Sequence, residues 1–147
     1  MHFEFEKLDV YQAALDFVVA ADRIAEALPR GRNYLKDQLR RAAASIPSNI
    51  AEGVGEFMPR EKARFYRIAR RSAVECASHL LVCRRLALVL EALLEPAMEL
   101  LHRIVAMATS MIRRAGARVS GQGREEERRG VDEGKPGENE RNRQRQR

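Results

Sequence analysis

The sequence from residue 39 to residue 53 decides the fold, and it reads Leu39-Arg-Arg-Ala-Ala-Ala-Ser-Ile-Pro-Ser-Asn-Ile-Ala-Glu-Gly53. Its apolar side chains return every three or four residues, which is the period of an α-helix buried on one face. Asn33 and Leu35 extend this helix towards its start, and Gly53 with Gly55 closes it. Pro47 lies inside the run, where it lacks a backbone donor and clashes with the carbonyl of the fourth residue before it. This second helix is therefore expected to be kinked at Pro47.

The segments on either side of this helix have the same period. The segment before it is expected to be N-capped by Asp9 and to end at Pro29. The segment after it starts at Pro59, because proline suits the first helical position, and it keeps one apolar face as far as Leu90.

A fourth helix is expected to open at Pro96 and to be capped by Gly116. No segment has the pattern of a strand. Four amphipathic helices with short connections predict an all-α, up-down four-helix bundle over residues 1–117. Residues 118–147 contain too few apolar side chains to offset the entropy of ordering, so they are expected to form a disordered charged tail. The arginines at its end either contact phosphates or are simply solvated.

Composition limits the class of protein. The 147 residues carry a formal charge of +6, which favours an anionic partner but also suits an ordinary solvated surface. Trp is absent and aromatic residues are 5%, which argues against a base-stacking platform. No apolar run is long enough for a signal peptide or a membrane span, so a cytoplasmic protein with reduced thiols and no membrane contact is expected.

A ridge of arginines is the strongest functional feature. Arg60, Arg64, Arg67 and Arg71 fall within roughly 60° of one another on a helical projection, and Arg85 follows further along the same helix. The positive charges in such a row repel one another, and a bound anion relieves this repulsion. Guanidinium groups also match phosphates in charge and geometry. The alternative is a solvated face paired with acids of neighbouring helices. The predicted nucleic-acid-binding residues are Arg40, Arg41, Arg60, Arg64, Arg67, Arg71 and Arg85.

Two groups of residues could suggest other chemistry. Cys76, His79 and Cys83 have ligand chemistry, but they share the expected core face and form no zinc knuckle, so no metal is expected. The residues beside Pro47 (Ser45, Ser48 and Asn49) lack the context of a nucleophile turn and are expected to satisfy backbone groups instead. We therefore expect no catalytic residue, no enzyme activity and no cofactor.

Some apolar residues exceed what one bundle core needs. The apolar residues of the fourth helix cover roughly half of its circumference, whereas a helix that packs on one core has an apolar stripe nearer 100° wide. Val74 and Leu81 also fall away from the core face of the third helix. This surplus favours self-association, although scattered exposed apolar residues are also common.

Three stretches together resemble a known family. They are Phe5-Glu-Lys-Leu-Asp-Val-Tyr-Gln-Ala-Ala14, the stretch quoted first, and Phe65-Tyr-Arg-Ile-Ala-Arg-Arg-Ser-Ala-Val-Glu75. They resemble the bacterial four-helix bundle proteins, also called 23S ribosomal RNA intervening-sequence proteins, over about residues 3–115. Arg71 departs from the family pattern, which often has Gly before the serine of the third stretch, and its side chain is expected to affect a close helix contact.

The resemblance implies a barrel-like homopentamer. It also implies similarity to the accessory protein of diversity-generating retroelements, which binds nucleic acid and the reverse transcriptase through a basic surface. The preferred interpretation is thus a non-enzymatic homo-oligomer that binds RNA or DNA, with a reverse transcriptase or another protein as a further partner. The alternative is a structural or adaptor protein whose main partner is another protein.

Overall fold

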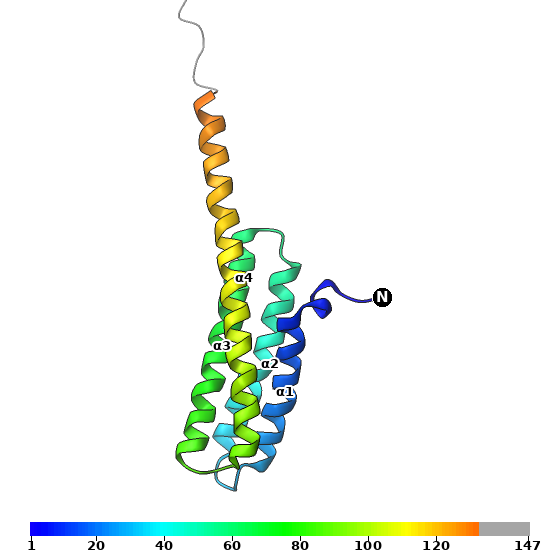
Figure 1. Ribbon diagram of the computed structural model, residues 1–147, viewed down its shortest axis with the longest axis vertical. Coiled ribbons are helices and arrows are strands. Elements are labelled where there is room, and N and C mark those ends of the chain that lie inside the picture. Colours follow the sequence, from blue (N-terminus) through cyan, green and yellow to red (C-terminus); the bar gives the residue numbers. More distant parts are fainter. Residues whose placement is uncertain (133–147) are drawn as a thin grey trace, which may run out of the picture.

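The computed structural model describes residues 1–132, and every regular element in this range is a helix (Figure 1). A short 3-10 helix, η1 (Glu4–Lys7), precedes α1 (Asp9–Ala27), α2 (Asn33–Gly55), α3 (Pro59–Arg85) and α4 (Glu91–Asp132). The predicted all-α four-helix bundle is confirmed. Within the described residues, no helix combines the length and the apolar character that a membrane span requires.

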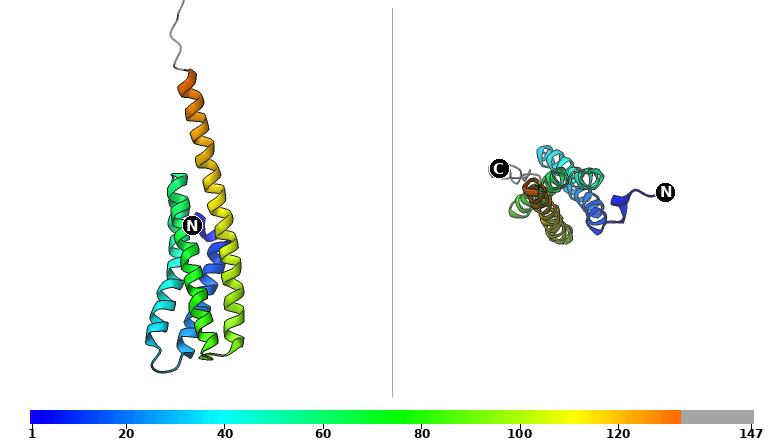
Figure 2. Two further views of the ribbon diagram at one scale, coloured as in Figure 1. Left: turned by 90° about the vertical axis from the view of Figure 1, so that its left-hand side faces the viewer. Right: turned by 90° about the horizontal axis from the view of Figure 1, so that it is seen from above.

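Each helix of the bundle packs against two neighbours. α1 contacts α2 and α4, and α3 contacts the same two helices, but the backbones of α1 and α3 do not approach each other closely. They therefore occupy opposite corners of the bundle and run in the same direction along it (Figures 1 and 2). Their outer faces consequently point to opposite sides of the molecule.

The core is built from the residues whose spacing predicted it. Phe17, Ile24, Ile46, Ile50 and Ile104 are at most 1% exposed, and alanines fill the space between them. Burying a large aliphatic or aromatic side chain contributes about 1.5–3 kcal/mol, so this row supplies much of the stability. The two cysteines of α3 belong to the same cluster.

The start of α1 differs from the prediction. Asp9 is the first helical residue rather than the N-cap, which is Leu8, and no side chain caps this end. The Gln12 amide Nε2 instead donates to the carbonyl oxygen of Glu6 at 2.9 Å. The glutamine thus ties the first turn of α1 to η1, a contact that a capping-box pattern does not reveal.

Pro47 lies within a continuous α2, and the kink remains a prediction. Of the polar residues beside it, Asn49 satisfies a backbone group as expected, whereas Ser45 also has a side-chain partner on α3. Asn49 Nδ2 donates to the carbonyl oxygen of Ser45 at 2.8 Å, and the Ser45 hydroxyl bonds that of Ser72 at 2.9 Å. The cluster therefore links α2 to α3. It does not reach the carbonyl of Ala43, which would accept a hydrogen bond from residue 47 if that residue had a backbone N–H.

The C-terminus of α3 comes earlier than predicted. The helix ends at Arg85, so Leu86 and Leu90 do not continue its apolar face. Ala87 adopts φ 51°, and the Leu88 N–H donates to the Cys83 carbonyl at 3.0 Å while the Ala87 N–H donates to that of Arg84 at 3.0 Å. These two bonds form a Schellman motif, which normally uses glycine at the left-handed position.

The fourth helix also begins earlier than predicted. α4 starts at Glu91, and Pro96 lies inside it. The Leu90 carbonyl accepts the N–H groups of Leu93 at 3.0 Å and Leu94 at 3.4 Å. Leu94 is 1% exposed, so its burial fixes the first turn before the proline.

The predicted tail is helical in its first part. Residues 118–132 continue α4 beyond the bundle (Figure 1), so the expectation of disorder was wrong there, and 133–147 lie outside the described residues. The side chains from 120 to 129 are exposed, as a segment without a core requires. Gly116, the predicted cap, therefore lies inside α4, and the helix continues through Gly121 and Gly123 although glycine is a poor helix former. A helix already nucleated can extend, and glutamates and arginines three and four residues apart support it.

Candidate nucleic-acid interface

The arginine ridge lies on the outer face of α3. The opposite face of this helix is buried, including Ala69, Cys76 and Leu80. Arg60, Arg67 and Arg71 are exposed, and none of them forms an ion pair with the described side chains. Arg71 therefore adds charge to the surface, and its effect on a close helix contact remains a prediction.

Arg64 belongs to the ridge but has local partners. Its Nε donates to Glu61 Oε2 at 3.0 Å, and its guanidinium carbon lies 4.5 Å from the centroid of the Phe65 ring. The side chain is 50% exposed, so the ion pair is screened by water and worth less than about 1 kcal/mol. The guanidinium can exchange this acid for a phosphate at small cost.

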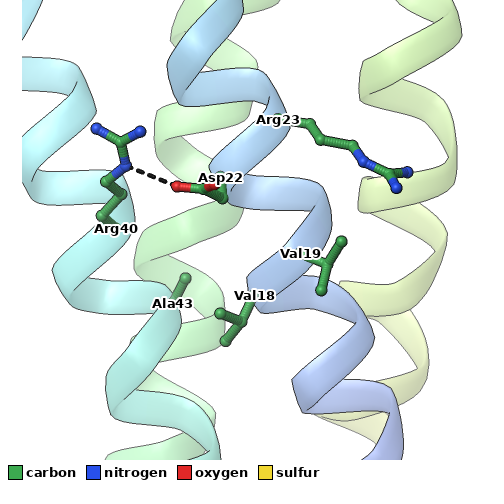
Figure 3. Close-up of a pocket in the computed structure, with 6 residues that line it drawn as sticks. All are labelled: Val18, Val19, Asp22, Arg23, Arg40 and Ala43. Carbon is green, nitrogen blue, oxygen red and sulfur yellow. Dashed lines mark hydrogen bonds and ion pairs between the residues drawn. The ribbon is translucent and has the colours of Figure 1, made fainter.

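Arg40 does not join the ridge. Its guanidinium Nε donates to Asp22 Oδ1 at 2.9 Å, and a second nitrogen bonds Glu26, so it lies on the α1 side of α2 (Figure 3). The bonds to Glu26 and Asp22 raise the pKa of Arg40 above its ordinary value. Two carboxylates thus neutralise this arginine, whereas Arg41 is exposed on α2 and has no ion-pair partner among the described side chains.

The C-terminal half of α3 carries its arginines differently. Arg84 bonds Glu91 at 3.1 Å and lies 3.4 Å from Glu95, both on α4. Arg85 is exposed and borders an open groove of about 530 Å³ together with apolar side chains of the same helix. Arg70, which the ridge pattern missed, donates from Nε to Thr109 Oγ1 of α4 at 2.9 Å.

Charge is divided unequally between the helices. α3 contains eight Arg or Lys against two Glu, a net +6, which equals the formal charge of the whole chain. α1 contains four acids and one arginine, a net −3. Because α1 and α3 occupy opposite corners, the bundle has a basic side and an acidic side.

The thiol groups of α3 lie in the core, and its imidazole lies beside a carboxylate. Cys76 and Cys83 are buried, and burial raises the pKa of the Cys76 thiol to about 12. His79 Nε2 lies 3.5 Å from Glu75 Oε1. Among residues 1–132 no three His, Cys, Asp or Glu side chains are grouped as metal ligands. The expectations of no metal, no cofactor and no catalysis remain predictions.

The sequence of this basic bundle matches a known protein family. Residues 6–110 match the model of the 23S rRNA-intervening sequence protein family. The chain belongs to this family. No curated protein matches it. The matched range covers most of α1 to α4 and includes the whole arginine ridge, so the ridge lies within the part of the chain that defines this intervening-sequence protein.

Of the two parts of the predicted apolar surplus, the one on α3 is exposed and the one on α4 is largely covered. Met98, Val105 and Met111 of α4 pack partly buried against the core, so the wide apolar arc of α4 is covered within one chain. Val74 and Leu81 are 48% and 49% exposed, as expected. Of the two observations that favoured self-association, the one on the outer face of α3 therefore remains.

Proposed function

We propose that this intervening-sequence protein binds RNA or DNA, without catalysis, through the arginine ridge of α3. The observation that carries the proposal is the exposure of Arg60, Arg67 and Arg71 in one row on a helix of net charge +6. The family name refers to ribosomal RNA and supports an RNA ligand. Exposed guanidinium groups without an acid partner contact phosphates at little desolvation cost.

The ridge favours contacts to the backbone of a nucleic acid. Neighbouring arginines of the ridge lie three or four residues apart on the helix, and each side chain can contact one phosphate. Two aromatic rings lie near the ridge: Phe65, which Arg64 covers, and Phe57, which is exposed in the turn before Arg60. Two separate rings do not form a row on which successive bases could stack. Binding should thus depend on charge and shape and be largely insensitive to sequence.

The proposal includes a homo-oligomer, and the family resemblance sets the expected number at five. A ring of copies would repeat the ridge in every subunit, and linked weak contacts gain affinity without any new contact. A light-scattering mass near five times 16.7 kDa would agree with this number.

The test is fluorescence anisotropy with structured RNA and with duplex DNA at two salt concentrations. Each phosphate contact should lower the slope of log K against log salt by about 0.7–0.9. The double variant Arg60→Glu and Arg67→Glu should bind at least about tenfold more weakly, because two contacts become repulsive. The matched control changes Arg30 and Arg103 to Glu, since both are exposed and lie off the ridge. Equal loss in both double variants would mean that only net charge matters.

An adaptor protein is the second candidate. The turn between α2 and α3 exposes 95% of Phe57 and 62% of Met58, which are unusual exposures for large apolar side chains. A partner protein would cover them. If the native chain binds neither nucleic acid even at low salt, the adaptor function takes precedence.

A further inference from the structure

The helices α3 and α4 pack against each other, and each has a long segment without acidic residues (Figure 1). In α4, residues 100–124 contain five arginines and no Asp or Glu. In α3, residues 62–74 contain four arginines and one lysine, again with no Asp or Glu. The positive charge of these segments is therefore not cancelled within them, unlike that of Arg84, which pairs with Glu91 and Glu95.

A hydrogen bond between side chains aligns the two segments. Arg70 Nε donates to Thr109 Oγ1 at 2.9 Å, and the Thr109 hydroxyl donates to the Val105 carbonyl oxygen at 2.7 Å. The hydroxyl thus accepts from the arginine with a lone pair, while its own proton is used within α4. Thr109 holds the Nε edge of the guanidinium. The two terminal nitrogens of Arg70, an exposed residue, are left for an anion.

The same alignment brings two more arginines to this point of the seam between α3 and α4. The helices run in opposite directions, because Arg84 contacts the start of α4 and Arg70 contacts its middle. Arg67 lies three residues before Arg70, and Arg113 lies four residues after Thr109, so each is one turn away on the same side of its helix. Both steps lead towards the same end of the bundle, by about 4.5 Å on α3 and about 6 Å on α4. Arg67 and Arg113 therefore lie at nearly the same height, on opposite sides of the seam.

These three arginines form a seam cluster that the described chain does not neutralise. Arg67, Arg70 and Arg113 are exposed, and none of them forms an ion pair with an acid in residues 1–132. Packed helices lie about 8–10 Å apart, a distance that side chains as long as arginine can span towards a shared ligand. Arg114, the next residue of α4, lies on the other side of that helix, where it lines a groove with Asp9 of α1.

We propose that the seam cluster binds one phosphate group of a nucleic-acid backbone between α3 and α4. The inference rests on the proposed function and adds Arg70 and Arg113 to its site, the second from another helix. Guanidinium groups on two sides can bond the free oxygens of a phosphodiester, which match their fork geometry. The cluster shares Arg67 with the ridge, so one backbone can contact both.

Within the cluster Arg70 is the anchor. Its bond to Thr109 orients the guanidinium before a ligand arrives, so less side-chain entropy is lost on binding than for an arginine that has no partner. Thr109 is accordingly a positioning residue, which acts on the phosphate only through Arg70.

The first test compares two adjacent residues of α4 that carry the same charge on different sides of the helix. Arg113→Gln removes a charge from the seam cluster, and Arg114→Gln removes one on the α1 side. In fluorescence anisotropy with structured RNA, Arg113→Gln should make the slope of log K against log salt less steep by at least about 0.7. Arg114→Gln should keep a slope near the native value. Both residues are exposed, so circular dichroism should show an unchanged fold.

The second test removes the hydroxyl group that orients Arg70. Thr109→Val keeps the size of the side chain and should weaken binding about two- to tenfold, because the ligand must then order the arginine itself. The salt slope should stay native, since Arg70 keeps its charge. Thr109→Ser keeps the hydroxyl and should bind like the native chain, whereas Arg70→Gln should lose both affinity and slope.

Three results would overturn the inference and leave the proposed function standing, provided that the ridge variant still loses binding. They are equal slopes for Arg113→Gln and Arg114→Gln, native binding by Arg70→Gln, and a Thr109→Ser variant as weak as Thr109→Val. Poly-glutamate serves as a competing anion. If Arg113→Gln weakens its binding and not that of RNA, the seam takes an acidic protein segment and the inference is wrong. A native chain that binds no nucleic acid would refute the proposed function, and the inference with it.

Discussion

Gly53 lies where α2 packs closely against side chains of α3, and adding one methyl group there tests the packing directly. A Cβ atom at Gly53 would lie 2.4 Å from Tyr66 Cε1, 2.7 Å from Tyr66 Cδ1 and 3.2 Å from Phe65 Cβ. The ring of Tyr66 is 7% exposed and cannot swing into solvent without leaving the core. Gly53→Ala should therefore overpack this contact, which costs about 1–3 kcal/mol.

Alanine is also the better helix former, by about 1 kcal/mol in a helix interior, and Gly53 lies two residues from the end of α2 where the gain is smaller. The net loss should be about 1–2 kcal/mol, which lowers the melting temperature by about 5 °C for a chain of this size. Thermal unfolding followed by circular dichroism at one protein concentration measures it, since self-association would also shift the midpoint.

Gly55→Ala is the matched control. A Cβ there meets nothing within 4 Å, so this change should be neutral or slightly stabilising. A double-mutant cycle with Tyr66→Leu should recover part of the loss at Gly53, because the smaller side chain vacates the contact. If Gly53→Ala melts at the same temperature as Gly55→Ala, the close approach of the two helices is not what requires glycine.

Two further predictions concern α3. Ala87→Gly should raise the free energy of unfolding by about 1 kcal/mol, because glycine adopts the left-handed conformation at φ 51° without a clash, and urea unfolding measures it; an unchanged midpoint would mean that the turn is not strained. The Cys76 thiol should react with a thiol reagent at pH 8 only as fast as the bundle opens, since burial keeps it protonated. Stability should fall as pH rises from about 9, where the unfolded thiol ionises, towards the folded pKa of about 12. Rapid labelling of folded protein at pH 8 would contradict the burial.

The sequence predicted what repeats along the chain and missed what depends on single residues. The spacing of Phe17, Ile46 and Ile104 identified the core, since only one face of each helix can be buried. It failed at Leu90, because the turn uses Ala87 where a Schellman motif normally has glycine, and alanine gives no signal. It also treated Pro96 as a helix start, although the burial of Leu94 sets the start earlier.

The arginines that share one helix were predicted correctly, whereas contacts between helices were not. The row from Arg60 to Arg71 follows from helical geometry alone, and its exposure agrees with the projection. The neutralisation of Arg40 could not be seen, because Asp22 and Glu26 belong to another helix and are brought near only by packing. For the same reason the apolar arc of α4 looked like a surplus, whereas α1 and α3 flank this helix and cover it.

The extension of α4 past the bundle acts as a built-in spacer. From Ala117 to Asp132 the helix rises about 22 Å. A fluorophore or a fused domain attached after a chain truncated at Asp132 would therefore start about two nanometres from the end of the bundle. A dye placed there and a second dye on the bundle would report the length of this extension by energy transfer, without touching the arginine ridge.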